Sequence, residues 1–246
     1  MSETADFYRF PWVDFPDCII HADEKHVRGH ASYHDAKTGD SDAAFELVRA
    51  FLNDQSLLRI RDLANKTKKG SITLVSAHAL EREGVNAIPE AMAEVLATSL
   101  GWEVEHQIVQ TNIVSHTKAD GFSRLAKQAA FEGEIVSGQS YLLVDDFIGQ
   151  GGTLANLRGW IMHCGGRVVG STVLTGKPYS AKLTVELSQI HELEQKHGQD
   201  LRQWWCSRFG FDYDCLTSSE ARYLIRTPSA DRIRNRITSA VKEGSR

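Results

Sequence analysis

The chain has few cysteines and prolines and no long apolar run. Its 246 residues include four cysteines and five prolines, and no two cysteines form a C-x-x-C pair. Scattered cysteines argue against a zinc site or a disulfide framework and favour a reducing compartment. No stretch reaches the ~18 apolar residues of a membrane-spanning helix, and the acidic start of the chain shows no apolar leader. We therefore expect a cytoplasmic protein without membrane association.

An excess of positive charge is also missing. Lysine and arginine together number 28 against 32 aspartates and glutamates, which gives a formal net charge of −4. The molecule as a whole is therefore not an obvious nucleic-acid binder. With 41% hydrophobic and 24% charged residues, the chain has the composition of an ordinary globular protein. Its length is sufficient to bury a core without disulfides or metal ions.

One segment combines an apolar run, two acids and a glycine-rich turn. Residues 141–154 read Tyr-Leu-Leu-Val-Asp-Asp-Phe-Ile-Gly-Gln-Gly-Gly-Thr-Leu. The run predicts a buried strand with Asp145 and Asp146 at its carboxyl end, and Thr153 opens an amphipathic helical pattern. Carboxylates accept hydrogen bonds from sugar hydroxyls, while loop amides and the positive end of a helix dipole attract phosphate. The segment therefore predicts a site for a phosphorylated sugar.

Two commoner glycine-rich phosphate motifs do not fit this segment. A dinucleotide fingerprint needs G-x-G-x-x-G, and Leu154 stands where the third glycine would follow Gly149 and Gly151. A P-loop needs Gly-Lys-Ser/Thr, and the loop contains no lysine. The plain alternative is an ordinary strand–turn–helix that happens to carry two adjacent acids.

The segment resembles the phosphoribosyl pyrophosphate (PRPP) motif of the type I phosphoribosyltransferases. That motif has four apolar residues, two acids, two mostly apolar residues, and a hydroxyl- and glycine-rich loop ending in threonine. The match covers the apolar run, both acids, Gly151, Gly152 and Thr153. The sequence departs from the motif at Gly149 and Gln150, where the family usually has threonine or serine hydroxyls that help bind the 5′-phosphate.

Strand and helix patterns alternate in the middle of the chain, which predicts an α/β fold with a parallel sheet. The strand patterns are Ile72–Ala77, Val104–Gln110, Tyr141–Val144 and Val168–Leu174, and the helical patterns are Ile88–Leu100, Arg124–Ala130 and Leu154–Met162. The resemblance implies a type I phosphoribosyltransferase core over residues 71–179. We expect residues 1–70 to form an N-terminal extension and candidate hood, with a helix over 41–54, and residues 180–246 to form a helical C-terminal appendage.

Ligands of such sheets bind beyond the carboxyl ends of the strands, so three loops should share one site. The first loop starts at Ala77 and contains His78 and Arg82, and the resemblance implies that it contacts diphosphate. The second follows the next strand and contains Lys118 and Arg124. In the family it is a lid that brings basic groups to the diphosphate and excludes water. For each of these loops, a solvated polar surface is the alternative.

The resemblance implies a Mg²⁺-dependent phosphoribosyltransferase of nucleotide metabolism that uses PRPP and a nitrogen acceptor, usually a nucleobase. Asp145 and Asp146 would hold the ribose hydroxyls and are the candidate metal ligands, and Lys118 and Arg124 would stabilise the leaving diphosphate. The candidate substrate-binding residues are Phe147, Ile148, Gly149, Gln150, Gly151, Gly152, Thr153, Ala77, His78 and Arg82. The acceptor itself cannot be identified from the sequence. A homo-oligomer is expected, because this fold often pairs through sheet edges or helices.

The N-terminal extension contains a group of histidines. They are His21, His26, His30 and His34. The last three have a spacing that would place them on one helix face, as metal ligands are, but Gly29 interrupts the helix and no cysteine accompanies them. Polar surface histidines are therefore the favoured interpretation. The residues that would reach the pocket if the extension folds over it are His21, Asp23, Lys25 and Arg28.

The C-terminal residues 217–246 carry an excess of basic side chains. They are Arg222, Arg226, Arg232, Arg234, Arg236, Lys242 and Arg246. Thr217 to Glu220 form a capping-box pattern ahead of a helix, and a second helix is expected over 230–241 after Pro228. Two basic helices can bind nucleic acid, so a non-catalytic PRPP- or nucleotide-sensing regulator is the alternative function. We favour solvated helices packed on the sheet, because a charge run is usually a solvated face.

Overall fold

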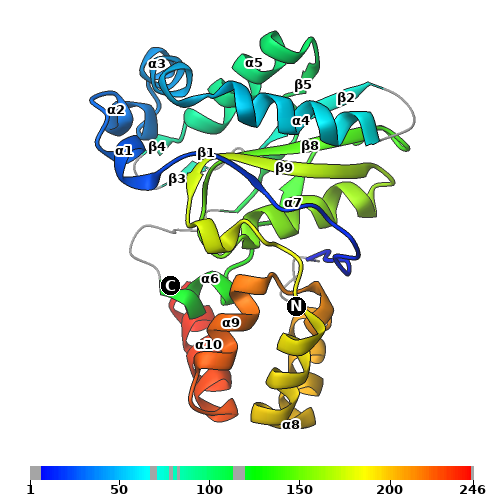
Figure 1. Cartoon of the computed structure of the whole chain (residues 1–246). Helices are drawn as coiled ribbons and strands as arrows, with labels where there is room; N and C mark the ends of the chain where they lie inside the picture. The colour runs from blue at the N-terminus through cyan, green and yellow to red at the C-terminus, as the bar shows by residue number, and fades with distance from the viewer. Residues whose placement is uncertain (1–6, 67–70, 78–79, 82–83, 113–119, 245–246) are drawn as a thin grey trace.

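The computed structural model describes residues 7–66, 71–77, 80–81, 84–112 and 120–244. Its centre is a five-stranded parallel sheet in the order β1-β9-β8-β2-β5 (Figure 1). The strands are β1 (Ile19–Ala22), β2 (Ile72–Ser76), β5 (Glu103–Glu105), β8 (Ser140–Ile148) and β9 (Arg167–Gly176). Two short antiparallel pairs are β3 (Leu80–Glu81) with β4 (Gly84–Val85) and β6 (Val109–Gln110) with β7 (Phe131–Glu132). The predicted α/β class with a parallel sheet is confirmed.

Alternate side chains of the strands point to opposite faces, and helices cover both faces (Figure 1). Leu142 and Val144 of β8 pack in one core layer, whereas Tyr141 and Leu143 belong to the other. The first layer is covered by α3 (Ser41–Phe51), α4 (Asp54–Lys66) and α5 (Ile88–Leu100), and the second by α7 (Gly152–His163). Burial of each large apolar side chain contributes about 1.5–3 kcal/mol, and burial on both faces explains why β8 is a continuous apolar run.

Three predicted elements need correction. The strand over 104–110 is divided into β5 and β6, because the Gln107 amide bonds back to the Glu105 side chain and turns the chain. The helix over 124–130 is α6 (Gly121–Ala126), because Asp120 caps it earlier and Asn112 binds the amide of Ala130. The helix over 41–54 ends at Phe51, and α4 follows it.

The sheet also takes a strand from the N-terminal region, which the sequence did not indicate. β1 has only four residues and pairs with β9. Its His21 is buried, and one ring nitrogen lies 3.0 Å from the Thr172 hydroxyl. Burial, together with the charge of Arg59, lowers the pKa of His21 to about 4. His21 is therefore a neutral core residue and does not reach the pocket.

The predicted helical C-terminal region is present and lies on the α7 side of the sheet (Figure 1). It contains α8 (Leu187–Phe209), α9 (Ser218–Arg226) and α10 (Ala230–Gly244). The predicted capping box of Thr217 and Glu220 is formed at the start of α9. α10 buries Ile233 and Ile237 in the core layer that also contains α6 residues. In the part of the chain that the structure describes, no helix has the length and apolar character needed to cross a membrane.

A buried ion pair joins the two ends of the chain. The Arg9 guanidinium donates two hydrogen bonds to the Glu220 carboxylate, at 2.7 and 3.0 Å, and a third to Asn156 of α7 at 2.6 Å. Each side chain of the pair is only 2% exposed. The neighbouring Tyr8 carbonyl crosses α7 so closely that a Cβ atom on Gly159 would lie 1.7 Å from it. The segment before β1 is thus fixed against α7 and α9.

We predict a strong coupling between Arg9 and Glu220 in stability. Arg9→Met leaves a buried carboxylate without its partner and should lower the free energy of unfolding by about 3–5 kcal/mol. Glu220→Gln should also be costly, and the double variant should lose less than the sum of the two. Urea unfolding measures all three, with the exposed Arg49→Met as the control, for which a change within about 0.5 kcal/mol is expected. Additive losses would contradict the coupling.

Candidate functional site

A cavity of about 550 Å³ lies beyond the carboxyl ends of β2 and β8. All residues of the range 145–154 line it, and Ala77 and Arg124 do so as well. The structure thus brings together most of the sequence-predicted site. His78, Arg82 and Lys118 lie outside the described residues, and their place in the site stays a prediction.

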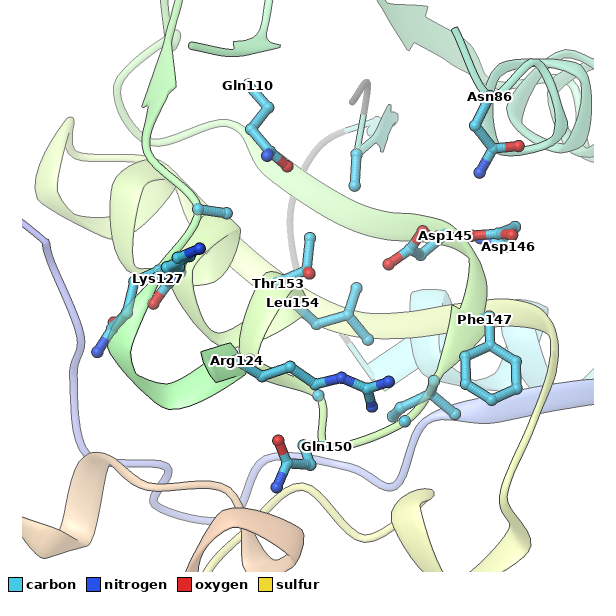
Figure 2. A pocket seen from close by; sticks show the side chains of 18 of the residues that line it. Asn86, Gln110, Arg124, Lys127, Asp145, Asp146, Phe147, Gln150, Thr153 and Leu154 are labelled. Carbon is cyan, nitrogen blue, oxygen red and sulfur yellow. Dashed lines mark hydrogen bonds between the residues drawn. The ribbon is translucent and has the colours of Figure 1, made fainter. Parts of the chain in front are cut away.

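The two acids at the end of β8 are not equivalent. Asp145 points into the cavity, whereas Asp146 points toward Asn86 (Figure 2). The Lys37 ammonium of α2 (Tyr33–Lys37) lies 3.0 Å from an Asp146 carboxylate oxygen, and the Asn86 side chain also bonds to Asp146. The Asp146 amide donates to the Asp145 carboxyl at 2.8 Å. Asp146 thus anchors α2, and Asp145 is the acid offered to a ligand.

Their surroundings move the two pKa values apart. Burial, and then the charge of Asp146, raise the pKa of Asp145 well above its usual range. Burial acts in the same direction on Asp146, but the Lys37 charge and hydrogen bonds outweigh it, so the pKa of Asp146 lies below its ordinary value. A proton taken up by the pair therefore resides on Asp145. Protonated Asp145 can donate one hydrogen bond and accept others, which suits a diol.

The loop after β8 offers backbone amides to the cavity. Gly151 has φ +81°, and a Cβ atom there would lie 2.6 Å from Leu183. The Thr217 hydroxyl donates to the Gln150 carbonyl at 2.5 Å and holds the loop from the C-terminal side. Among the described residues, none accepts a hydrogen bond from the amides of 149–153. Free amides at the start of the 12-residue helix α7 form a cradle for an anion.

Arg124 approaches this cradle from α6, as the central side chain of Figure 2 shows. One terminal nitrogen of its guanidinium would lie 3.1 Å from a Cβ atom on Gly149. Arg124 forms no ion pair with any described residue, and its Nε is buried without a hydrogen-bond partner. An uncompensated cation next to free amides adds attraction for a phosphate group.

Further wall residues come from segments that the motif does not include. Arg28 of α1 (Glu24–Arg28) and Tyr33 and Lys37 of α2 line one part of the cavity, and Gln110 and Lys127 line another. Of the polar residues expected to reach the pocket, Arg28 therefore does, while Asp23 instead caps α1. For the residues of α1 and α2, the only signal in the sequence was the polar character of the N-terminal segment, which many solvated helices share.

The side chains of the cavity could hold a magnesium ion only if a bound ligand supplied further oxygen atoms. No group of three or more histidine, cysteine, aspartate or glutamate side chains among the described residues could hold a metal. In particular, the chain between His26 and His34 is broken into α1 and α2. Asp145 and Asp146 supply two carboxyl groups. Mg²⁺ is commonly held by one or two carboxylates completed by substrate phosphates and water. Here Asp145 is the carboxyl group left for such an ion, because Lys37 and Asn86 engage Asp146.

Comparison with known proteins gives relatives but no activity. No protein-family model matches the chain. It is 38% identical over 243 residues to "Protein TraN" of Escherichia coli, a match that covers 99% of this chain and 54% of that protein. It is 37% identical over 155 residues to an uncharacterized protein of Haemophilus influenzae, covering 63% of this chain and 34% of that protein. The chain thus spans about half of the first relative's length and less of the second's.

Similar solved structures include two adenine phosphoribosyltransferases. The one from Leishmania tarentolae has a TM-score of 0.34 at 13% identity, and the match covers 78% of this chain and 92% of the neighbour's chain. The one from Leishmania donovani has a TM-score of 0.35 at 13% identity, and the match covers 68% of this chain and 75% of the neighbour's chain. At such scores, the chemistry of the site has to be argued from its own residues.

The unequal surroundings of the acids predict unequal responses to substitution. In Asp146→Asn, the pKa of Asp145 should fall because a like charge is removed, yet stay raised by burial. In Lys37→Met, the pKa of Asp146 should rise because its cation is lost. Carboxyl-carbon NMR titration measures both values, with the exposed Asp42→Asn as the control. An Asp145 pKa that is insensitive to residue 146 would refute the coupling of the pair.

Proposed function

We propose that the cavity binds PRPP and that the protein is a Mg²⁺-dependent phosphoribosyltransferase acting on a nitrogen acceptor, with nucleobases as the first candidates. One observation carries the proposal. An acid that faces inward, a cradle of free amides and an uncompensated arginine line the same cavity, and they come from β8, α7 and α6. These are the groups that a ribose, its 5′-phosphate and a diphosphate require.

The 5′-phosphate would occupy the amides of 149–153, where the positive end of the α7 dipole adds to their attraction. Asp145 would then contact the ribose hydroxyls. Its buried position supports this role, because a hydrogen bond that is shielded from water is electrostatically stronger than an exposed one. Gly151 and Gly152 let the loop pass close to Leu183 and Glu220, from which a Cβ atom would lie only 2.6 and 3.0 Å away, and Thr153 adds a hydroxyl to the wall.

In the transfer, the bond between the ribose C1 and the diphosphate oxygen breaks. The acceptor nitrogen forms the new bond to C1 and loses its proton. Negative charge grows on the leaving diphosphate, which Lys118 would stabilise, while Arg124, beside Gly149, would hold the 5′-phosphate. One such preorganised donor commonly contributes about 3–4 kcal/mol to the transition state. A bound Mg²⁺ would supply further neutralisation of the diphosphate.

The regulator alternative has weaker support. Of the basic C-terminal side chains, Arg222 donates to the Tyr179 carbonyl and the Ser219 hydroxyl, and Arg236 pairs with Asp120. These two arginines are engaged in holding the helices to the rest of the chain. We therefore place catalysis first and let the experiment below decide.

We predict PRPP binding that depends on the cavity. Calorimetric titration of PRPP with Mg²⁺ into the wild type should give heat that is lost in Asp145→Asn/Asp146→Asn. It should be weakened by about 10- to 100-fold in Arg124→Gln, because a charged hydrogen bond contributes about 1.5–3 kcal/mol. Asp42→Asn should bind as the wild type does. Diphosphate release with a panel of bases then tests catalysis.

Two results would count against the proposal. Absence of PRPP heat in the folded wild type would refute the binding site. Binding without diphosphate release for any acceptor, together with salt-dependent nucleic-acid binding that is lost when Arg232 and Arg234 are neutralised, would favour the regulator.

A further inference from the structure

Arg124 reaches the cavity from a helix that the C-terminal helices hold in place. α6 lies against α9 and α10 (Figure 1). Its Phe122 is buried in the same core layer as Ile233 and Ile237 of α10. The Arg124 amide donates to the Asp120 carbonyl at 3.2 Å, so the arginine follows the start of α6 by one turn. A movement of that start therefore also moves the Arg124 side chain.

The start of α6 fits closely against Tyr223 of α9. A Cβ atom on Gly121 would lie 2.3 Å from the Tyr223 ring, so glycine allows an approach that any other residue would prevent. The Tyr223 hydroxyl bonds to the backbone of Phe122 and Gly121. The rings of Phe122 and Tyr223 meet edge to face, with their centres 5.0 Å apart. These contacts fix the position of the first turn of α6.

An ion pair from α10 adds to this contact. The Arg236 guanidinium donates to the Asp120 carboxylate, which also caps α6 by accepting from the Ser123 amide at 2.9 Å. The two side chains of the pair are 54% and 38% exposed, and exposed ion pairs contribute little to stability. The close fit at Gly121 is therefore the larger constraint on α6, and the ion pair is the smaller one.

α9 also holds the opposite side of the proposed phosphate site. The hydroxyl of Thr217, the residue that caps α9, donates to the Gln150 carbonyl in the glycine-rich loop. α9 thus contacts the loop through its cap and contacts the helix of Arg124 through Tyr223. Groups that bind one ligand have to be held within about 0.5 Å of their productive positions by the residues behind them. The same helix supports both sides of this site.

We propose that α9 and α10 set the separation between Arg124 and the loop amides, and that Gly121, Tyr223 and Arg236 are positioning residues for the phosphate group. They act through Arg124 and do not line the cavity. The inference rests on the proposed function, from which it takes the placement of the 5′-phosphate. It gives the C-terminal helices a role in ligand affinity, which helices that only cover the core would not have.

Calorimetric titrations with ribose 5-phosphate, and separately with PRPP and Mg²⁺, test the inference. Gly121→Ala should weaken both ligands by about 10-fold, because the added Cβ atom displaces the start of α6 from Tyr223. This loss lies within the range of about 10- to 100-fold expected for Arg124→Gln. In the Arg124→Gln background, Gly121→Ala should change neither affinity further. General damage to the fold would instead add to the effect of Arg124→Gln.

Arg236→Gln is a milder variant that keeps the test valid if Gly121→Ala does not fold. It should weaken both ligands by about two- to fivefold and leave urea unfolding nearly unchanged, because the pair is exposed. Arg236→Lys should restore most of the affinity, since an ammonium group can still pair with Asp120. Arg234→Gln is the matched control, because Arg234 pairs with Asp231 inside α10, and it should bind as the wild type does.

The outcomes separate the inference from the proposed function. Wild-type affinity in Gly121→Ala or in Arg236→Gln, or additive losses in Gly121→Ala/Arg124→Gln, would overturn the inference and leave the proposed function standing. Binding of ribose 5-phosphate without binding of PRPP would overturn the proposed function, and the variants would then decide the inference with ribose 5-phosphate. Absence of binding for both ligands in the wild type would overturn both.

Discussion

The ion pair between Arg9 and Glu220 is the contact on which the geometry of the loop depends. It is buried, and it joins residues that are 211 positions apart. Glu220 also binds the Thr217 amide, while the Thr217 hydroxyl holds the Gln150 carbonyl. A chain of polar contacts thus runs from the N-terminal segment through α9 to the amide cradle. Because each buried charge needs its partner, the network fixes one arrangement of the loop and explains why Glu220 of α9 lines the cavity.

The two adjacent acids of the motif, Asp145 and Asp146, have different roles in the structure. Lys37 and Asn86 hold Asp146, so this acid positions α2 over the cavity. Asp145 remains buried and faces inward, where burial and its charged neighbour favour protonation. A neutral carboxyl group beside a sugar can donate as well as accept a hydrogen bond. Asp146 thus attaches α2, while Asp145 faces the cavity that Arg28 of α1 also lines.

Local patterns in the sequence predict local structure well here. The run before Asp145, the glycine turn and the helix after Thr153 depend on neighbours in the chain, so periodicity indicates them. Partners that are distant in sequence leave no such trace. Lys37 meets Asp146 across 109 positions, and nothing around Lys37 distinguishes it from a solvated lysine. β1 was missed for the same reason, because four residues become a strand only when β9 is beside them.

Gly149 links the departure from the motif to the chemistry of the cavity. Threonine or serine at this position would supply a hydroxyl, but a Cβ atom there would stand 3.1 Å from the Arg124 guanidinium and crowd it. With glycine at position 149, the loop lacks a neutral hydroxyl donor, but the charged guanidinium of Arg124 can approach the same place. Hydrogen bonds from charged groups contribute about 1.5–3 kcal/mol, against about 0.5–1.5 kcal/mol for neutral ones. On this comparison, the phosphate binding that we propose for the loop would depend on Arg124 of α6 in place of hydroxyl groups on the loop.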